Sequence, residues 1–221
     1  MSGRPAAGGG RWVEVDPTRL PRWLAGFAER HGAGAGEPFA DGLRLTSPDG
    51  TVAELYPPPG APLPADLDDL VRQSAQPRRI GLLLARQGGV AVGIAYGTTL
   101  EVSKVDSRYV QGRTAAGGWS QHRFARRREN QAKAAAGEAA EIVARLLLPA
   151  TSDLAALVTG GDRRAVEAVL ADPRLAPLVA LRSSRFLTVG DPKHATLAAA
   201  VAQARAVRIR LVDPATGPAL R

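Results

Sequence analysis

Residues 80–97, with the sequence IGLLLARQGGVAVGIAYG, decide the fold of the main domain. Two apolar runs, Ile80 to Arg86 and Gly89 to Gly97, are separated by Gln87 and Gly88. Such runs, interrupted by a short turn sequence, predict two buried strands joined as a hairpin. A third strand is expected over residues 99–105, where apolar side chains alternate loosely with polar ones.

Downstream of the hairpin, helical and strand patterns alternate. Residues 121–148 hold the longest helical pattern, and its apolar side chains recur at steps of three and four, which predicts that they share one face: Phe124, Ala132, Ala135, Ala139, Ile142 and Leu146. Further strands are predicted over residues 154–159, 186–189 and 207–212, and further helices over 163–170 and 196–206. This alternation predicts an α/β fold with a mixed sheet flanked by helices and an antiparallel opening.

Upstream of the hairpin, the sequence predicts a small α+β N-terminal module. Asp16 begins a helix that ends near Gly32, and a hairpin joins residues 42–46 to 51–56 through a Pro-Asp-Gly turn. The prolines between Tyr56 and Pro64 exclude helix and central strand. The predicted division is therefore a flexible tail at 1–10, the module at 11–56, a proline-rich linker with a short helix at 57–76, the main domain at 77–213 and a C-terminal tail at 214–221.

Charge and composition narrow the classes of partner. The 29 Lys and Arg against 21 Asp and Glu give a net charge of +8, which favours a polyanion, either nucleic acid or an acidic membrane surface. No run of about 18 apolar residues is present, so no membrane-spanning segment is expected. The chain lacks cysteine, which fits a reducing cytoplasm. Its three histidines lie far apart in sequence, so a metal site is not expected.

The most informative segment is residues 111–131, QGRTAAGGWSQHRFARRRENQ. Residues 104–133 carry eight Lys and Arg against two Asp and Glu, so most of the net charge lies here. Arginine binds phosphate through two N–H groups and stays charged, so this segment suits an RNA backbone. The alternative is a solvated helix face. The residues predicted to contact RNA are Arg113, Trp119, Arg123, Arg126, Arg127, Arg128 and Lys133.

A glycine pair, Gly117-Gly118, precedes Gln121 in this segment. Glycine permits positive φ and lets a ligand approach the backbone closely. Glutamine offers one acceptor and two donors without charge, so Gln121 can orient a water molecule without titrating. Trp119 either stacks on a nucleobase or pins the loop against the domain. We expect residues 108–120 to form a loop that is mobile in the isolated protein, because small residues and glycines dominate it.

A second glycine pair, at residues 160–161, is followed by Asp162 and a predicted helix. This arrangement either cradles a phosphate at the N-terminus of the helix or supplies an aspartate cap for it. No Ser/His/Asp set, carboxylate pair or metal cluster stands out in the sequence.

Residues 117–126 resemble the catalytic loop of eukaryotic and archaeal class-one peptide release factors. In their central domain, Gly-Gly-Gln-Ser-x-x-Arg-Phe-Ala-Arg leads into a long basic helix. Here the glycine pair and Arg123-Phe124-Ala125-Arg126 keep the same offset, but Gln121 stands three residues after Gly118 instead of one. This spacing resembles that of the Vms-like release factors, whose loop reads Gly-x-x-Gln. Within that family, the segment is most similar to the actinobacterial-type branch of peptidyl-tRNA hydrolases.

The resemblance implies a release-factor-like catalytic domain at 77–213 that hydrolyses the ester between nascent peptide and tRNA on stalled ribosomes. Gln121, Gly117 and Gly118 would form its catalytic loop, with much of the remaining site supplied by ribosomal RNA. The implied partners are peptidyl-tRNA and the peptidyl-transferase centre of the large ribosomal subunit. We expect a cytoplasmic monomer that binds no membrane and needs no cofactor. Two alternatives remain: cleavage of the tRNA 3′ end, and RNA or ribosome binding without catalysis.

Overall fold

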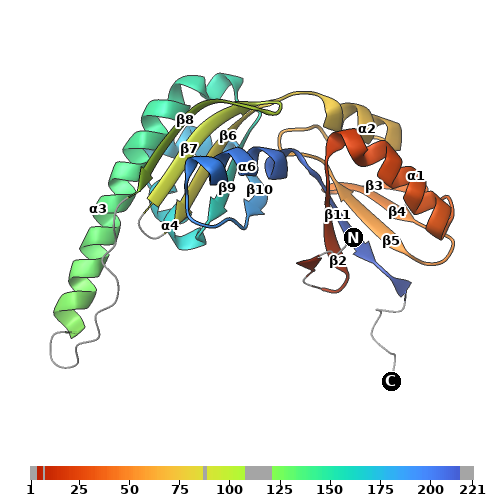
Figure 1. The fold of residues 1–221 in the computed structure, drawn as a ribbon, viewed down its shortest axis with the longest axis horizontal. Helices are drawn as coiled ribbons and strands as arrows, with labels where there is room; N and C mark the ends of the chain where they lie inside the picture. Colours follow the sequence, from red (N-terminus) through yellow and green to blue (C-terminus); the bar gives the residue numbers. More distant parts are fainter. Residues whose placement is uncertain (1–3, 7, 87–88, 108–120, 215–221) are drawn as a thin grey trace. The chain divides into compact units, whose positions relative to one another are not determined.

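The computed structural model describes residues 4–6, 8–86, 89–107 and 121–214, with the backbone alone at Ser107 and 121–130. The chain divides into two compact units. The first comprises Met1–Pro77 with Ala202–Arg221, and the second comprises Arg78–Val201. Because their relative placement is not determined, each unit is described by itself (Figure 1).

The second unit is built on a five-stranded mixed sheet in the order β10-β9-β6-β7-β8. The hairpin of β6 (Arg79–Arg86) and β7 (Gly89–Tyr96) is antiparallel, and β8 (Thr99–Ser107) continues it on the far side of β7. On the other side, β9 (Ala156–Gly161) runs parallel to β6, and β10 (Arg182–Leu187) runs parallel to β9. The predicted mixed sheet with its antiparallel opening is therefore confirmed.

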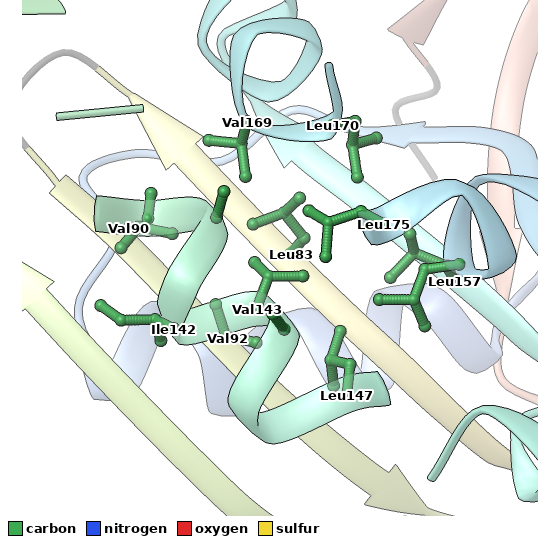
Figure 2. Close-up of a cluster of buried hydrophobic side chains, with 14 of the residues drawn as sticks. Leu83, Val90, Val92, Ile142, Val143, Leu147, Leu157, Val169, Leu170 and Leu175 are labelled. Carbon is green, nitrogen blue, oxygen red and sulfur yellow. The ribbon is translucent and has the colours of Figure 1, made fainter. Parts of the chain in front are cut away.

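Helices flank this sheet. The long α3 (Gln121–Leu147) and α4 (Arg163–Leu170) pack on one face, where Val143 and Leu147 meet Leu157 of β9 (Figure 2). A 3₁₀ turn, η2 (Leu148–Asp153), follows α3, and η3 (Pro173–Leu175) leads into α5 (Ala176–Ala180). The opposite face lies against α6 (His194–Arg205), because a Cβ added to Gly93 of β7 would lie 3.0 Å from the Leu197 side chain.

The first unit holds a six-stranded sheet, and every strand pair in it is antiparallel. Its order is β1 (Arg4–Pro5), β2 (Arg11–Val15), β11 (Val207–Val212), β5 (Val52–Tyr56), β4 (Gly42–Thr46) and β3 (Ala35–Phe39). After the turn η1 (Pro17–Arg19), α1 (Leu20–His31) packs with α2 (Leu67–Ala75) on one face of this sheet, through Leu20, Phe27 and Leu70. The predicted helix near Asp16 and the hairpin at 42–56 are confirmed.

Strand β11 corrects one expectation. Residues 207–212 were predicted to be the closing strand of the main domain, but β11 lies between β2 and β5 of the first unit. Ile209 pairs there with Val13 on one side and Leu55 on the other. The strand itself was predicted correctly, and its residues alternate between buried and half-buried. The sequence pattern at 207–212 contains no information about which sheet the strand joins. Strands β2 and β3 of the same sheet were not predicted.

Candidate functional site

Helix α3, which carries the predicted site, has two different parts. Its C-terminal part is packed: Ala139, Ala140, Val143 and Leu147 are buried in the core of the second unit. Its residues 131–135 are all exposed, and Figure 1 shows the helix extending well beyond the sheet. We call residues 139–147 the base of α3 and residues 121–138 its arm.

Only part of the predicted apolar face of the helix is buried. Ala132 and Ala135 were expected on one face with Ala139 and Ile142, but Ala132 and Ala135 are exposed, whereas Ala139 and Ile142 are buried. The reason is length. At about 1.5 Å per residue the 27 residues of α3 extend roughly 40 Å, whereas the 8 residues of β7 extend only about 27 Å. The helix is therefore longer than the sheet, and its N-terminal part has no sheet to pack against.

An ion-pair cluster adds to the packing at the base. The Arg174 guanidinium lies 2.8 Å from the Glu141 carboxylate of α3 and 2.9 Å from the Asp172 carboxylate. Hydrogen bonds from the Arg174 side chain, and then from its backbone N–H, hold the pKa of Asp172 below its usual value. The same pairing raises the pKa of Arg174, mainly through Asp172. Arg174 and Glu141 are both exposed, so burial of apolar side chains dominates the stability of the base.

The structure places the predicted site residues unevenly. Gln121 is the first residue of α3, as predicted, and Arg123, Arg126, Arg127 and Arg128 follow within the arm. Their side chains lie outside the part of the chain that the structure describes. The described part also excludes residues 108–120, which contain Arg113, Gly117, Gly118 and Trp119. The expected mobility of this segment therefore stays a prediction. Lys133 is described and exposed on the arm.

The arm contains a glycine, Gly137, that weakens the helix close to the base and that was not singled out from the sequence. Gly137 is exposed, and a Cβ added there would meet no atom within 4 Å. Glycine inside a helix costs about 1 kcal/mol relative to alanine, and packing does not require it here. It stands two residues before the base begins at Ala139. A lone glycine inside the longest helical pattern was the available signal.

The second glycine pair has a structural explanation. Asp162 caps α4 by accepting a hydrogen bond from the Ala165 N–H at 3.0 Å, so the N-cap alternative is confirmed. Gly161 has φ of 99°, and a Cβ there would lie 2.3 Å from the carbonyl oxygen of Ala85. A Cβ on Gly160 would lie 2.8 Å from the carbonyl oxygen of Leu187. Both glycines are thus required by the close approach of neighbouring strands.

Within the described ranges, no group of three or more His, Asp or Glu side chains is arranged to hold a metal ion. None of the helices described there combines the length and apolar character needed to cross a membrane.

The second unit is thus an α/β domain in which a long helix that begins at Gln121 projects from a mixed sheet. The sequence model for the Actinobacteria/chloroflexi VLRF1 release factor matches residues 78–210, more than half of the chain. The protein therefore belongs to this release factor family. The match continues into β11, whose partners β2 and β5 lie outside it.

The solved structures that resemble this chain are only distantly similar to it in sequence. An archaeal translation termination factor, aRF1, is 18% identical with a TM-score of 0.45, over 73% of this chain and 51% of that one. A second structure, described as an archaeal protein, is also 18% identical, with a TM-score of 0.38 over 71% and 48% of the two chains. The chain thus spans about half the length of these two structures. No curated protein matches it.

Proposed function

We propose that the protein is a peptidyl-tRNA hydrolase that frees nascent chains from tRNA on stalled ribosomes. The observation that carries this proposal is the position of Gln121, at the start of a helix that extends beyond its own domain, in a member of a release factor family. A projecting helix is about 10–12 Å wide with its side chains, so it can enter an RNA cavity that a whole domain cannot.

In the proposed reaction, water attacks the ester carbonyl that joins the peptide to the terminal adenosine of the tRNA. The ester C–O bond breaks, the peptide leaves as a carboxylic acid, and a proton passes to the ribose oxygen. Gln121 positions the water or excludes competing nucleophiles. Backbone N–H groups near Gly117 and Gly118 support the developing oxyanion, as preorganised donors do in other acyl transfers.

The arm supplies the affinity in this proposal. Arg113, Trp119 and the arginines at 123, 126, 127 and 128 contact RNA of the large subunit or of peptidyl-tRNA, and Lys133 extends the same basic surface. The exposure of residues 131–135 supports this assignment, because this part of the helix is not used for packing within the domain. The protein acts as a cytoplasmic monomer, and ribosomal RNA forms much of the catalytic centre.

The decisive experiment uses stalled ribosome–nascent-chain complexes and follows both the peptide and the tRNA 3′ end. Gln121→Ala is expected to lower the release rate by about a hundredfold or more, the effect of removing one key polar group from an acyl-transfer site. Gln131→Ala is the matched control, since it removes the same side chain from an exposed position ten residues further along α3. Near-normal release by Gln121→Ala would refute the catalytic role, and a shortened tRNA would establish cleavage of its 3′ end instead.

A further inference from the structure

The second unit has a polar hollow between α4 and β10, and it contains no residue of α3. Its volume is about 370 Å³, and it is lined by Thr159, Arg163, Arg182, Ser183, Ser184 and Phe186. Thr159 comes from β9, so the hollow lies where β9 and β10 run side by side next to the start of α4 (Figure 1). We call it the α4–β10 hollow.

The hydroxyl of Thr159 is the first indication of a ligand. Thr159 is 1% exposed, and its Oγ1 has no hydrogen-bond partner among the described residues. An unpaired buried hydroxyl destabilises a protein, and valine would fill the same space in a strand without that cost. Thr159 is one of the residues that line the hollow, so a group bound there is a candidate partner for this hydroxyl.

The charges around the hollow are the second indication. Arg182 makes two contacts with the Glu167 carboxylate, at 2.6 and 3.0 Å. The Arg163 guanidinium instead lies over the Phe186 ring, 4.2 Å from its centre. Stacking occupies the flat face of a guanidinium and leaves the N–H groups at its edge available to an anion. Two arginines facing one glutamate leave a single excess positive charge.

Two serines complete the set of donors. The Ser183 Oγ accepts a hydrogen bond from the Arg185 N–H at 3.1 Å, which leaves its own O–H free to donate. Ser184 is exposed and also lines the hollow. Hydroxyl and guanidinium donors together match the oxygens of a phosphoryl group.

We propose that the α4–β10 hollow seats one phosphodiester of an RNA backbone, held by Arg163 and the hydroxyls of Thr159, Ser183 and Ser184. The single charge of a phosphodiester matches the one uncompensated arginine, whereas a phosphate monoester carries about −1.5 to −2 at neutral pH. This proposal goes beyond the proposed hydrolase function, because it does not involve Gln121 or the arm. It gives the second unit a second point of contact with RNA.

The test titrates the full chain with a dinucleotide that has one phosphodiester and, separately, with inorganic phosphate, while NMR follows the backbone amides. The dinucleotide is expected to shift the amides of Thr159, Ser183 and Ser184. Arg163→Ala should abolish these shifts, and Thr159→Val should weaken binding about tenfold, the loss expected for one hydrogen bond to a charged group. Thr159→Val should not lower the melting temperature, so a loss of binding cannot be ascribed to unfolding.

Arg164→Ala is the matched control, because Arg164 is the next residue of α4, carries the same charge and does not line the hollow. It should retain the dinucleotide shifts, as should Gln121→Ala, which separates this site from the hydrolase proposal. Equal losses in Arg163→Ala and Arg164→Ala would overturn the site in favour of general electrostatic attraction. Shifts with inorganic phosphate alone would overturn the assignment to RNA, and no shift with either probe would overturn the anion site itself.

Discussion

The base and the arm of α3 belong to one helix but differ in burial and in amino-acid composition. In the base, buried side chains such as Val143 and Leu147 pack against the sheet. In the arm, residues 131–135 are exposed and the sequence is rich in arginine and alanine. Burial of apolar area stabilises a fold, whereas exposed basic residues leave the folding free energy nearly unchanged and remain available to a partner. Substitutions in the base are therefore expected to change stability, and substitutions in the arm are expected to change RNA binding.

The largest effect on stability is expected in the base. Leu147→Ala removes a side chain that is 0% exposed and leaves a cavity beneath the helix. The free energy of unfolding should fall by about 2–5 kcal/mol, the usual range for a buried leucine. Chemical denaturation would measure it. An unchanged midpoint would show that the base contributes little, and the contrast between base and arm would then fail.

An intermediate effect, on binding alone, is expected in the arm. Replacing Arg123, Arg126 and Arg127 together with alanine should weaken binding to ribosomes and tRNA. Each lost phosphate contact should lower the slope of log affinity against log salt by about 0.7–0.9. The melting temperature should stay the same, because these positions precede the packed base. If affinity and salt slope both match the unmodified protein, this part of α3 is a solvated surface and the RNA contact lies elsewhere.

The smallest effect is expected between the two parts. Gly137→Ala should stabilise the arm by about 1 kcal/mol, because alanine is the better helix former and the added Cβ meets no neighbour. Hydrogen exchange of the amides around residues 131–138 should slow accordingly. Ala134→Gly, at another exposed position of the arm, is the reverse control and should speed it. Unchanged exchange in both variants would show that local helix propensity does not govern the arm.

Much of the second unit could be predicted from the sequence. The hairpin at 80–97 consists of apolar runs and a turn, and α3 begins at Gln121 as its helical pattern indicates. These are local features, in which a side chain and its neighbours along the chain determine the conformation. The identity of Gln121 as a catalytic candidate also came from the sequence alone, and its role stays a prediction.

Tertiary structure decided what local pattern does not specify. A period of two predicts the strand at 207–212, but only the fold decides that Ile209 lies between Val13 and Leu55. A period near 3.6 predicts that Ala132 and Ala139 share a helix face, but the end of the sheet decides that only Ala139 is buried. Periodicity records which side chains are grouped together on one element. Which surface covers that group depends on residues far away in the chain, just as the α4–β10 hollow exists only because Thr159 and Ser184 are brought together by strand pairing.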